Sequence, residues 1–89
     1  RQGRILLVDD RRSSYERLAA MLEEEHIVEI EPDPSAALFR SAEGNYELLI
    51  VSLSLENFDG LRLCSQLRSL ERTRNLPILA ICEPDDTAR

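Results

Sequence analysis

The sequence is short of the features that mark several classes of protein. Two cysteines in 89 residues, Cys64 and Cys82, are too few for a disulfide scaffold, and both lie in apolar runs, so we expect reduced core thiols. No stretch approaches the ~18 consecutive apolar residues of a membrane span, and the start RQGRILLV does not have the pattern of a signal peptide. Basic residues are outnumbered by acidic ones, 11 to 17, and the net charge of −6 argues against a nucleic acid or an anionic membrane as the main partner. The composition therefore predicts a cytoplasmic protein.

What the chain does contain is enough for one small domain. Hydrophobic residues make up 43% of the chain and charged residues 31%, which is the balance of an ordinary globular protein. No repeat, low-complexity segment or linker divides the 89 residues, and a core of this size must be small. We therefore expect residues 1–89 to belong to a single domain.

Four segments have the pattern of strands. Unbroken apolar runs (ILLV, LLIV and ILAI), typical of parallel strands covered on both faces, occur in three of them: Arg4–Val8, 46–52 and 77–82. In Ile27–Glu31 the acidic Glu29 and Glu31 alternate with Val28 and Ile30. This alternation indicates an edge strand with one wetter face.

Helices are predicted between the strands. Ser13 or Ser14 is placed to cap the first helix. The apolar stripe of this helix has the spacing i, i+3, i+4 and i+7 and consists of Tyr15, Leu18, Ala19 and Leu22. In the second helix Asp33 can cap, Pro34 can take the first helical position, and Gly44 marks the end. Its apolar residues include Ala36, Ala37 and Phe39.

A third helix opens after Asp59 and Gly60, which we interpret as a turn and a helix start. Arg62 and Arg68 are expected on its outer face. The residues expected to face the core are Leu63, Cys64, Leu67 and Leu70.

The predicted order of elements is β-α-β-α-β-α-β. This order implies right-handed crossovers and a parallel sheet with helices on both faces. With the wetter strand at the edge, the strands run 2-1-3-4, the beginning of a flavodoxin-like, doubly wound α/β sheet. The ligand crevice of such a sheet lies outside the carboxyl ends of the first and third strands, where Asp9, Asp10 and Ser52 fall.

The segments LLVDD, LLIVSLSLENFDG and LPILAI resemble, in order and spacing, the receiver domain of two-component response regulators. In that family the acids after the first strand hold Mg²⁺, an aspartate ending the third strand accepts a phosphoryl group, and a Thr or Ser ending the fourth strand senses it. The resemblance assigns Asp9 and Asp10 to the acid pair. It places Ser52 where the phosphoacceptor aspartate would stand and Cys82 at the Thr/Ser position.

A closer likeness is carried by ENFDGLRLCSQLRSLERTRNLPILAI with EPDD after it, which is similar to the degenerate second receiver of PleD-type diguanylate cyclases. The likeness implies a non-enzymatic adaptor between a neighbouring receiver and a cyclase domain of the parent chain, which helps two chains form a homodimer. Such a receiver is not expected to take phosphate.

The chemistry of Ser52 favours the same interpretation. A serine hydroxyl is a weak nucleophile unless a base activates it, and the pattern places no His or Lys to do so. Loss of one of three carboxylates also weakens a Mg²⁺ site, so we expect no resident metal and at most weak Mg²⁺ at Asp9 and Asp10. These two acids would otherwise cap the first helix or bond the turn after the first strand.

Two other functions are compatible with parts of the pattern. A conventional receiver with residual Mg²⁺-dependent phosphoryl acceptance would retain the fold, although Ser52 argues against it. A small Mg²⁺-dependent phosphohydrolase could use Asp9 as nucleophile, but a third carboxylate at the end of the third strand is lacking.

The remaining predictions concern the surface and the end of the chain. Arginines on and after the third helix form either a solvated face or a docking surface for an acidic partner or anionic ligand: Arg62, Arg68, Arg72 and Arg74. Cys82, with no flanking cation, is expected to be a core thiol. The strand at 77–82 is as apolar as the central ones, and 83–89 leave no room for another strand and helix, so we expect a C-terminally incomplete receiver whose fourth strand needs a neighbour.

Overall fold

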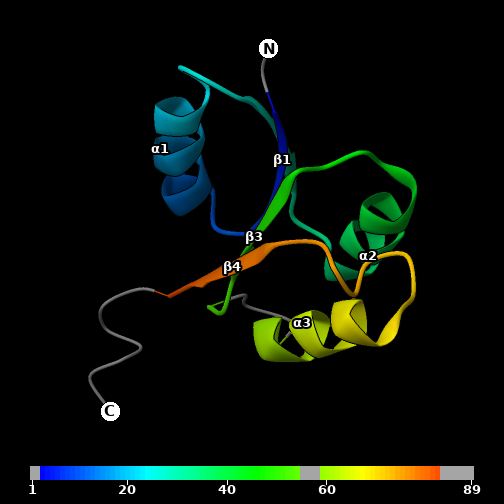
Figure 1. The fold of residues 1–89 in the computed structure, drawn as a ribbon. Helices are drawn as coiled ribbons and strands as arrows, with labels where there is room; N and C mark the ends of the chain where they lie inside the picture. The colour runs from blue at the N-terminus through cyan, green and yellow to red at the C-terminus, as the bar shows by residue number, and fades with distance from the viewer. Residues whose placement is uncertain (1–2, 55–58, 83–89) are drawn as a thin grey trace.

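The computed structural model describes residues 3–54 and 59–82 (Figure 1). Strands and helices alternate in the predicted order: β1 (Arg4–Val8), α1 (Arg12–Leu22), β2 (Ile27–Glu31), α2 (Pro34–Glu43), β3 (Leu48–Ser52), α3 (Gly60–Ser69) and β4 (Ile78–Ile81). The strands predicted at 46–52 and 77–82 are therefore slightly shorter than expected. Within the described ranges, no helix has the length and apolar character needed to cross a membrane.

The strands form one parallel sheet in the order β2-β1-β3-β4, as the sequence predicted. Helix α1 lies on one face of the sheet, and α2 and α3 lie on the other (Figure 1). This is the flavodoxin-like arrangement, and β2 is at an edge as its alternating acids indicated. The carboxyl ends of β1 and β3 are neighbours, because Val8 pairs with Val51.

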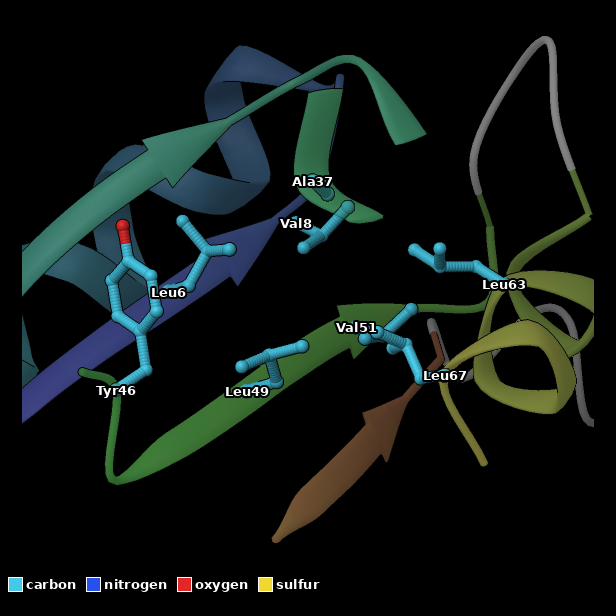
Figure 2. Close-up of a cluster of buried hydrophobic side chains, with 8 residues drawn as sticks. All are labelled: Leu6, Val8, Ala37, Tyr46, Leu49, Val51, Leu63 and Leu67. Carbon is cyan, nitrogen blue, oxygen red and sulfur yellow. The ribbon is translucent and has the colours of Figure 1, made fainter. Parts of the chain in front are cut away.

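Each face of the sheet has its own core. Figure 2 shows the core under α2 and α3, in which side chains from β1 and β3 meet both helices; its buried members are Leu6, Val8, Ala37, Tyr46, Leu49, Val51, Leu63 and Leu67. The core under α1 contains Ile5, Leu7, Ala19 and Ile50, with the predicted stripe residues Tyr15, Leu18 and Leu22 packed against it. The central strands β1 and β3 contribute to both cores, which explains their unbroken apolar sequences.

The predicted cap of α2 is confirmed, and α3 has a cap of the same kind at Asp59. Asp33 Oδ1 accepts the backbone N–H of Ser35 at 3.0 Å, with proline in the first turn of α2. Asp59 Oδ1 accepts the N–H of Leu61, also at 3.0 Å. In both helices a carboxylate thus satisfies one of the N–H groups that have no partner within the helix.

The prediction that Ser13 or Ser14 caps α1 is wrong. The helix begins at Arg12 and its N-cap is Arg11, which makes no side-chain capping hydrogen bond. Both serines therefore lie inside the first turn, beyond the capping position. The carboxylate of Asp9 instead accepts the N–H of Arg11 at 2.9 Å, so the acid orders the turn that leads into the helix.

Two predicted core positions, Leu70 and Cys82, are also wrong, and the apolar Phe39 of α2 is exposed as well. Phe39 is 69% exposed because it lies two residues from both Ala37 and Ser41, which are buried, and so points away from the core. Leu70 is 39% exposed because α3 ends one residue before it and its backbone is extended. Cys82 is exposed because it follows the last residue of β4, at an edge of the described sheet.

Strand β4 has a neighbouring strand only on its β3 side within the described part of the chain. Leu79 is 52% exposed there, although it pairs with the buried Ile50. An apolar edge of this kind invites pairing with another strand. That a further segment or a partner covers it stays a prediction.

Candidate functional site

Polar side chains follow the carboxyl ends of β1 and β3. Val8 and Val51 are opposite each other in the sheet, so Asp9 and Ser52 take the next position on each chain. Ser52 also pairs with Ile81, which places Cys82 just beyond the same edge. We refer to Asp9, Asp10 and Ser52 as the acid pocket. The predicted site residues are thus brought to one edge of the sheet, as the strand order required.

Asp9 is the most constrained member of the acid pocket. Its side chain is fully buried, with 0% exposure. Oδ1 accepts the N–H of Arg11 at 2.9 Å, whereas Oδ2 is buried and has no hydrogen-bond partner among residues 3–54 and 59–82. A buried carboxylate with one unsatisfied oxygen is costly, because a charge taken from water needs compensation. Asp10, next to it, is half-buried.

Ser52 is 2% exposed, and its hydroxyl oxygen accepts the N–H of Ser54 at 3.2 Å. The hydroxyl therefore bonds the backbone two residues on, as serine often does in turns. Gly60, at the start of α3, packs closely against the end of β3, because a Cβ added at Gly60 would lie 2.4 Å from the Ser52 carbonyl oxygen. The end of β3 is thus fixed by a local hydrogen bond and by the close approach of α3.

The two cysteines differ in environment. Cys64 is half-buried against the core under α2 and α3, and burial raises the pKa of its thiol. Cys82, at the position that the resemblance assigned to a Thr or Ser, is exposed. Cys64 therefore matches the predicted core thiol and Cys82 does not.

A second group of charges, which we call the Glu29 cluster, lies at the β2 edge on the side of α2. Glu29 accepts hydrogen bonds from the Tyr46 hydroxyl at 2.6 Å, from the Arg4 guanidinium at 2.6 Å and from Arg40. Arg40 also donates to Glu31 at 2.9 Å, and the Arg4 guanidinium lies 4.8 Å from the centre of the Tyr46 ring. The two acids of the edge strand are therefore held by partners from β1, α2 and the segment before β3.

The Glu29 cluster perturbs the pKa values of its members. The hydrogen bonds from Tyr46 and then Arg4 lower the pKa of Glu29 to about 2 from its ordinary 4.5. Burial, followed by the hydrogen bond to Glu29, raises the pKa of Tyr46. The hydrogen bond to Glu31 is the largest cause that raises the pKa of Arg40. The Glu29 carboxylate is thus ionised at neutral pH, and its charge is paired with arginines of the same chain.

The four arginines predicted as a surface cluster are all exposed but play different roles. Arg68 donates to the backbone carbonyls of Arg74 and Leu76, each at 2.7 Å. It therefore anchors the chain between α3 and β4, residues 70–76, which we call the arginine turn. Arg72 and Arg74 lie in this turn, whereas Arg62 is at the opposite end of α3.

Sequence reasoning missed the partners in the Glu29 cluster and the fully buried Thr73, whose hydroxyl donates to the Leu67 carbonyl. The two-residue spacing of Glu29 and Glu31 could have signalled a shared face that needs basic partners. Thr73 lies in the polar segment ERTRN, and nothing in that pattern distinguishes it from a solvated residue.

Comparison with known proteins agrees with this geometry. A family model described as the response regulator receiver domain matches residues 5–89, so the chain belongs to the response regulator receiver family. It is 51% identical over 87 residues to the response regulator PleD of Caulobacter vibrioides (strain NA1000 / CB15N). That match covers 98% of this chain but 19% of PleD, so the chain spans about a fifth of this relative.

Solved structures show the same fold. A sensor protein from Polaromonas sp. JS666 superposes with a TM-score of 0.87 at 29% identity, over 94% of this chain and 68% of that one. The receiver domain of a sensor histidine kinase from Pseudomonas aeruginosa PAO1 has a TM-score of 0.82 at 26% identity, over 90% of this chain and 66% of that one. The structure of that receiver has a magnesium ion coordinated in its active site cleft.

The acid pocket offers a hard cation two carboxylates and one hydroxyl. Mg²⁺ demands hard oxygen ligands in near-octahedral geometry and is bound through carboxylates. Asp9 and Asp10 supply two, but the donor at the end of β3 is the neutral hydroxyl of Ser52, which already accepts an N–H. Within the described ranges, no three His, Cys, Asp or Glu side chains come together to hold a metal.

Proposed function

We propose that this receiver is degenerate and does not accept a phosphoryl group, and that it acts as an adaptor and dimerisation module in a two-component signalling protein. The observation that carries the proposal is the buried Ser52 at the end of β3, whose hydroxyl accepts the Ser54 N–H. An adaptor needs the receiver fold and its surfaces but does not need a working acceptor. The domain itself would have no enzymatic activity.

The chemistry of the acid pocket supports this proposal. A carboxylate attacks a phosphoryl donor as an anion, whereas a serine hydroxyl must lose its proton to a base. The 89 residues contain no lysine, and the one histidine, His26, precedes β2, at the opposite end of the strands from Ser52. The neutral hydroxyl also leaves the pocket with one carboxylate fewer, so Mg²⁺ would bind weakly or not at all.

The parent chain is part of the same proposal. The likeness to the second receiver of PleD-type diguanylate cyclases, together with the 51% identity to PleD, supports a parent that synthesises cyclic di-GMP. The partners would then be a neighbouring receiver or the cyclase domain of the same chain, in a cytoplasmic homodimer. Neither a nucleic acid nor a membrane would be a partner, because the net charge is −6.

The experiment that tests the lack of phosphorylation uses acetyl phosphate with Mg²⁺, followed by intact-mass measurement of the chain. We expect no added phosphoryl group under conditions that label a conventional receiver in a parallel reaction. A phosphorylated Ser52, or phosphate on Asp9 or Asp10, would show instead that the domain is a receiver with residual acceptance. Detection of the labelled control receiver makes a negative result informative.

A further inference from the structure

The arginine turn is held in one conformation by two anchors. Thr73 is fully buried, and its hydroxyl donates to the carbonyl oxygen of Leu67 in the last turn of α3. On the outer side, the guanidinium of Arg68 donates to the carbonyls of Arg74 and Leu76, each at 2.7 Å. The turn is therefore fixed on its inner side by a buried hydroxyl and on its outer side by a guanidinium.

Arg72 and Arg74 flank the buried Thr73 and are both exposed. Neither forms an ion pair within the described residues, and the exposed Glu71 in the same turn is not bonded to either of them. Three other arginines are bound to glutamates: Arg4 to Glu29, Arg12 to Glu16, and Arg40 to both Glu29 and Glu31. Arg17 and Arg62 are exposed without an ion pair within the described residues, but neither has an arginine of the same kind beside it. In a chain with 17 acidic and 11 basic residues, two neighbouring arginines are thus presented without an internal acid.

We infer that the arginine turn is a docking surface for an acidic segment of another protein domain. A guanidinium binds a carboxylate through two parallel N–H donors, which gives the pair both strength and geometric specificity. Because the backbone of the turn is already ordered, the entropy lost when a partner binds is mainly that of the two arginine side chains. Leu70, 39% exposed in the same turn, adds an apolar contact.

The overall charge favours a protein over a nucleic acid as the partner. The chain carries −6, so a polyanion with dense phosphates would be repelled by most of the surface, whereas a short acidic segment need only meet the turn. The inference deepens the adaptor role proposed above and rests on it, because an adaptor needs a surface that a neighbouring domain recognises. The peptide measurement below does not depend on phosphorylation, so the two can fail separately.

The test measures binding of a fluorescein-labelled hexaglutamate peptide to the 89-residue chain by fluorescence anisotropy, at about 50 mM salt where screening is moderate. We expect Arg72→Ala and Arg74→Ala each to raise the Kd about fivefold, as loss of one well-placed ion pair predicts. Arg17→Ala and Arg62→Ala are matched controls, because both arginines are exposed and lack an ion pair within the described residues. We expect these controls to change the Kd less than about twofold.

A second variant tests the ordering of the turn separately from its charge. Arg68→Ala leaves Arg72 and Arg74 in place but removes the two hydrogen bonds to the turn carbonyls, and we expect it to raise the Kd about threefold. Arg68→Lys keeps a donor and should restore part of the affinity. Circular dichroism checks that each variant is folded.

Several results would overturn the inference. The first is equal weakening by Arg17→Ala and Arg72→Ala, which would mean that hexaglutamate responds only to total charge. The second is no measurable binding by the folded wild-type chain at low salt. The third is tighter binding of a hexathymidylate oligonucleotide than of hexaglutamate, which would assign the turn to phosphates.

Discussion

Acidic side chains at two places in this fold have opposite surroundings. In the Glu29 cluster, the carboxylate in the middle of β2 accepts hydrogen bonds from three donors. In the acid pocket, Asp9 is more deeply buried but has one N–H partner, and its second oxygen has none within the described ranges. The better-compensated acid is therefore the less buried one.

The difference follows from where each acid lies along the strands. Glu29 lies within the sheet, where α2 packs beside β2 and Arg40 can reach it. Asp9 lies one residue beyond β1, at the edge where a doubly wound sheet leaves a crevice. Acids within the layers are thus compensated by the fold itself. At the crevice, Asp9 keeps one carboxylate oxygen without a hydrogen-bond partner within the described ranges. In the function proposed above, Ser52 also removes one of the charges that would hold a cation there.

The largest expected effect is on the Glu29 cluster. Glu29→Ala should lower the free energy of unfolding by about 3 kcal/mol, because it leaves two guanidinium groups and the Tyr46 hydroxyl without their shared acceptor. Glu16→Ala is the control, since Glu16 pairs with Arg12 on the exposed surface of α1 and its loss should cost less than about 0.5 kcal/mol. Urea unfolding followed by circular dichroism measures both. Equal losses would mean that the Glu29 cluster contributes no more to stability than an exposed ion pair.

The same cluster should make stability depend on pH. A carboxylate whose pKa is about 2 in the folded state and 4.5 when unfolded contributes fully above 4.5, and its contribution is lost as the pH falls from 4.5 towards 2. Each pKa unit corresponds to about 1.4 kcal/mol, and the partial exposure of Glu29 reduces the total to about 2 kcal/mol. The free energy of unfolding of wild type minus that of Glu29→Gln should shrink over this window. A constant difference from neutral pH down to the lower end of the window would contradict the assignment.

The two regions also differ in how well the sequence predicts them. The strand order, the helix cap at Asp33 and the meeting of Asp9 with Ser52 all followed from local patterns. Hydrophobic period, capping residues and chain order are properties of neighbours in sequence. The Glu29 cluster did not, since its members come from four separate segments. The exposure of Cys82 was missed because an apolar run does not reveal where its strand ends, and Cys82 lies one residue beyond β4.

Restoring the third carboxylate should make the acid pocket respond to metal. Ser52→Asp removes the hydroxyl that accepts the Ser54 N–H and adds a negative charge beside Asp9 and Asp10, so without divalent ions it should cost about 1 to 2 kcal/mol. Millimolar Mg²⁺ should recover this loss, because hard-ion sites depend on the number of charged ligands. Ser52→Asn is the neutral control and should not respond to Mg²⁺. If the Tm of Ser52→Asp is also unchanged by Mg²⁺, other parts of the pocket have lost the geometry that a metal needs.

The smallest expected effect tests the contrast directly, by removing the charge of each acid while keeping its shape. In the wild type, the Arg11 N–H donates to Asp9 Oδ1 at 2.9 Å, and Asp9 Oδ2 has no hydrogen-bond partner within the described residues. Asp9→Asn keeps an oxygen for the Arg11 N–H and removes the buried charge. We expect the free energy of unfolding to rise by up to about 1 kcal/mol, whereas Glu29→Gln should lower it. Asp9→Ala is the control for the turn, because it also removes the acceptor for Arg11 and should lose about 1 kcal/mol relative to Asp9→Asn. Urea titrations of the wild type and the three variants at neutral pH measure these differences in the free energy of unfolding. If Asp9→Asn is as damaging as Glu29→Gln, the Asp9 carboxylate has a compensating partner of its own and the two regions do not differ in kind.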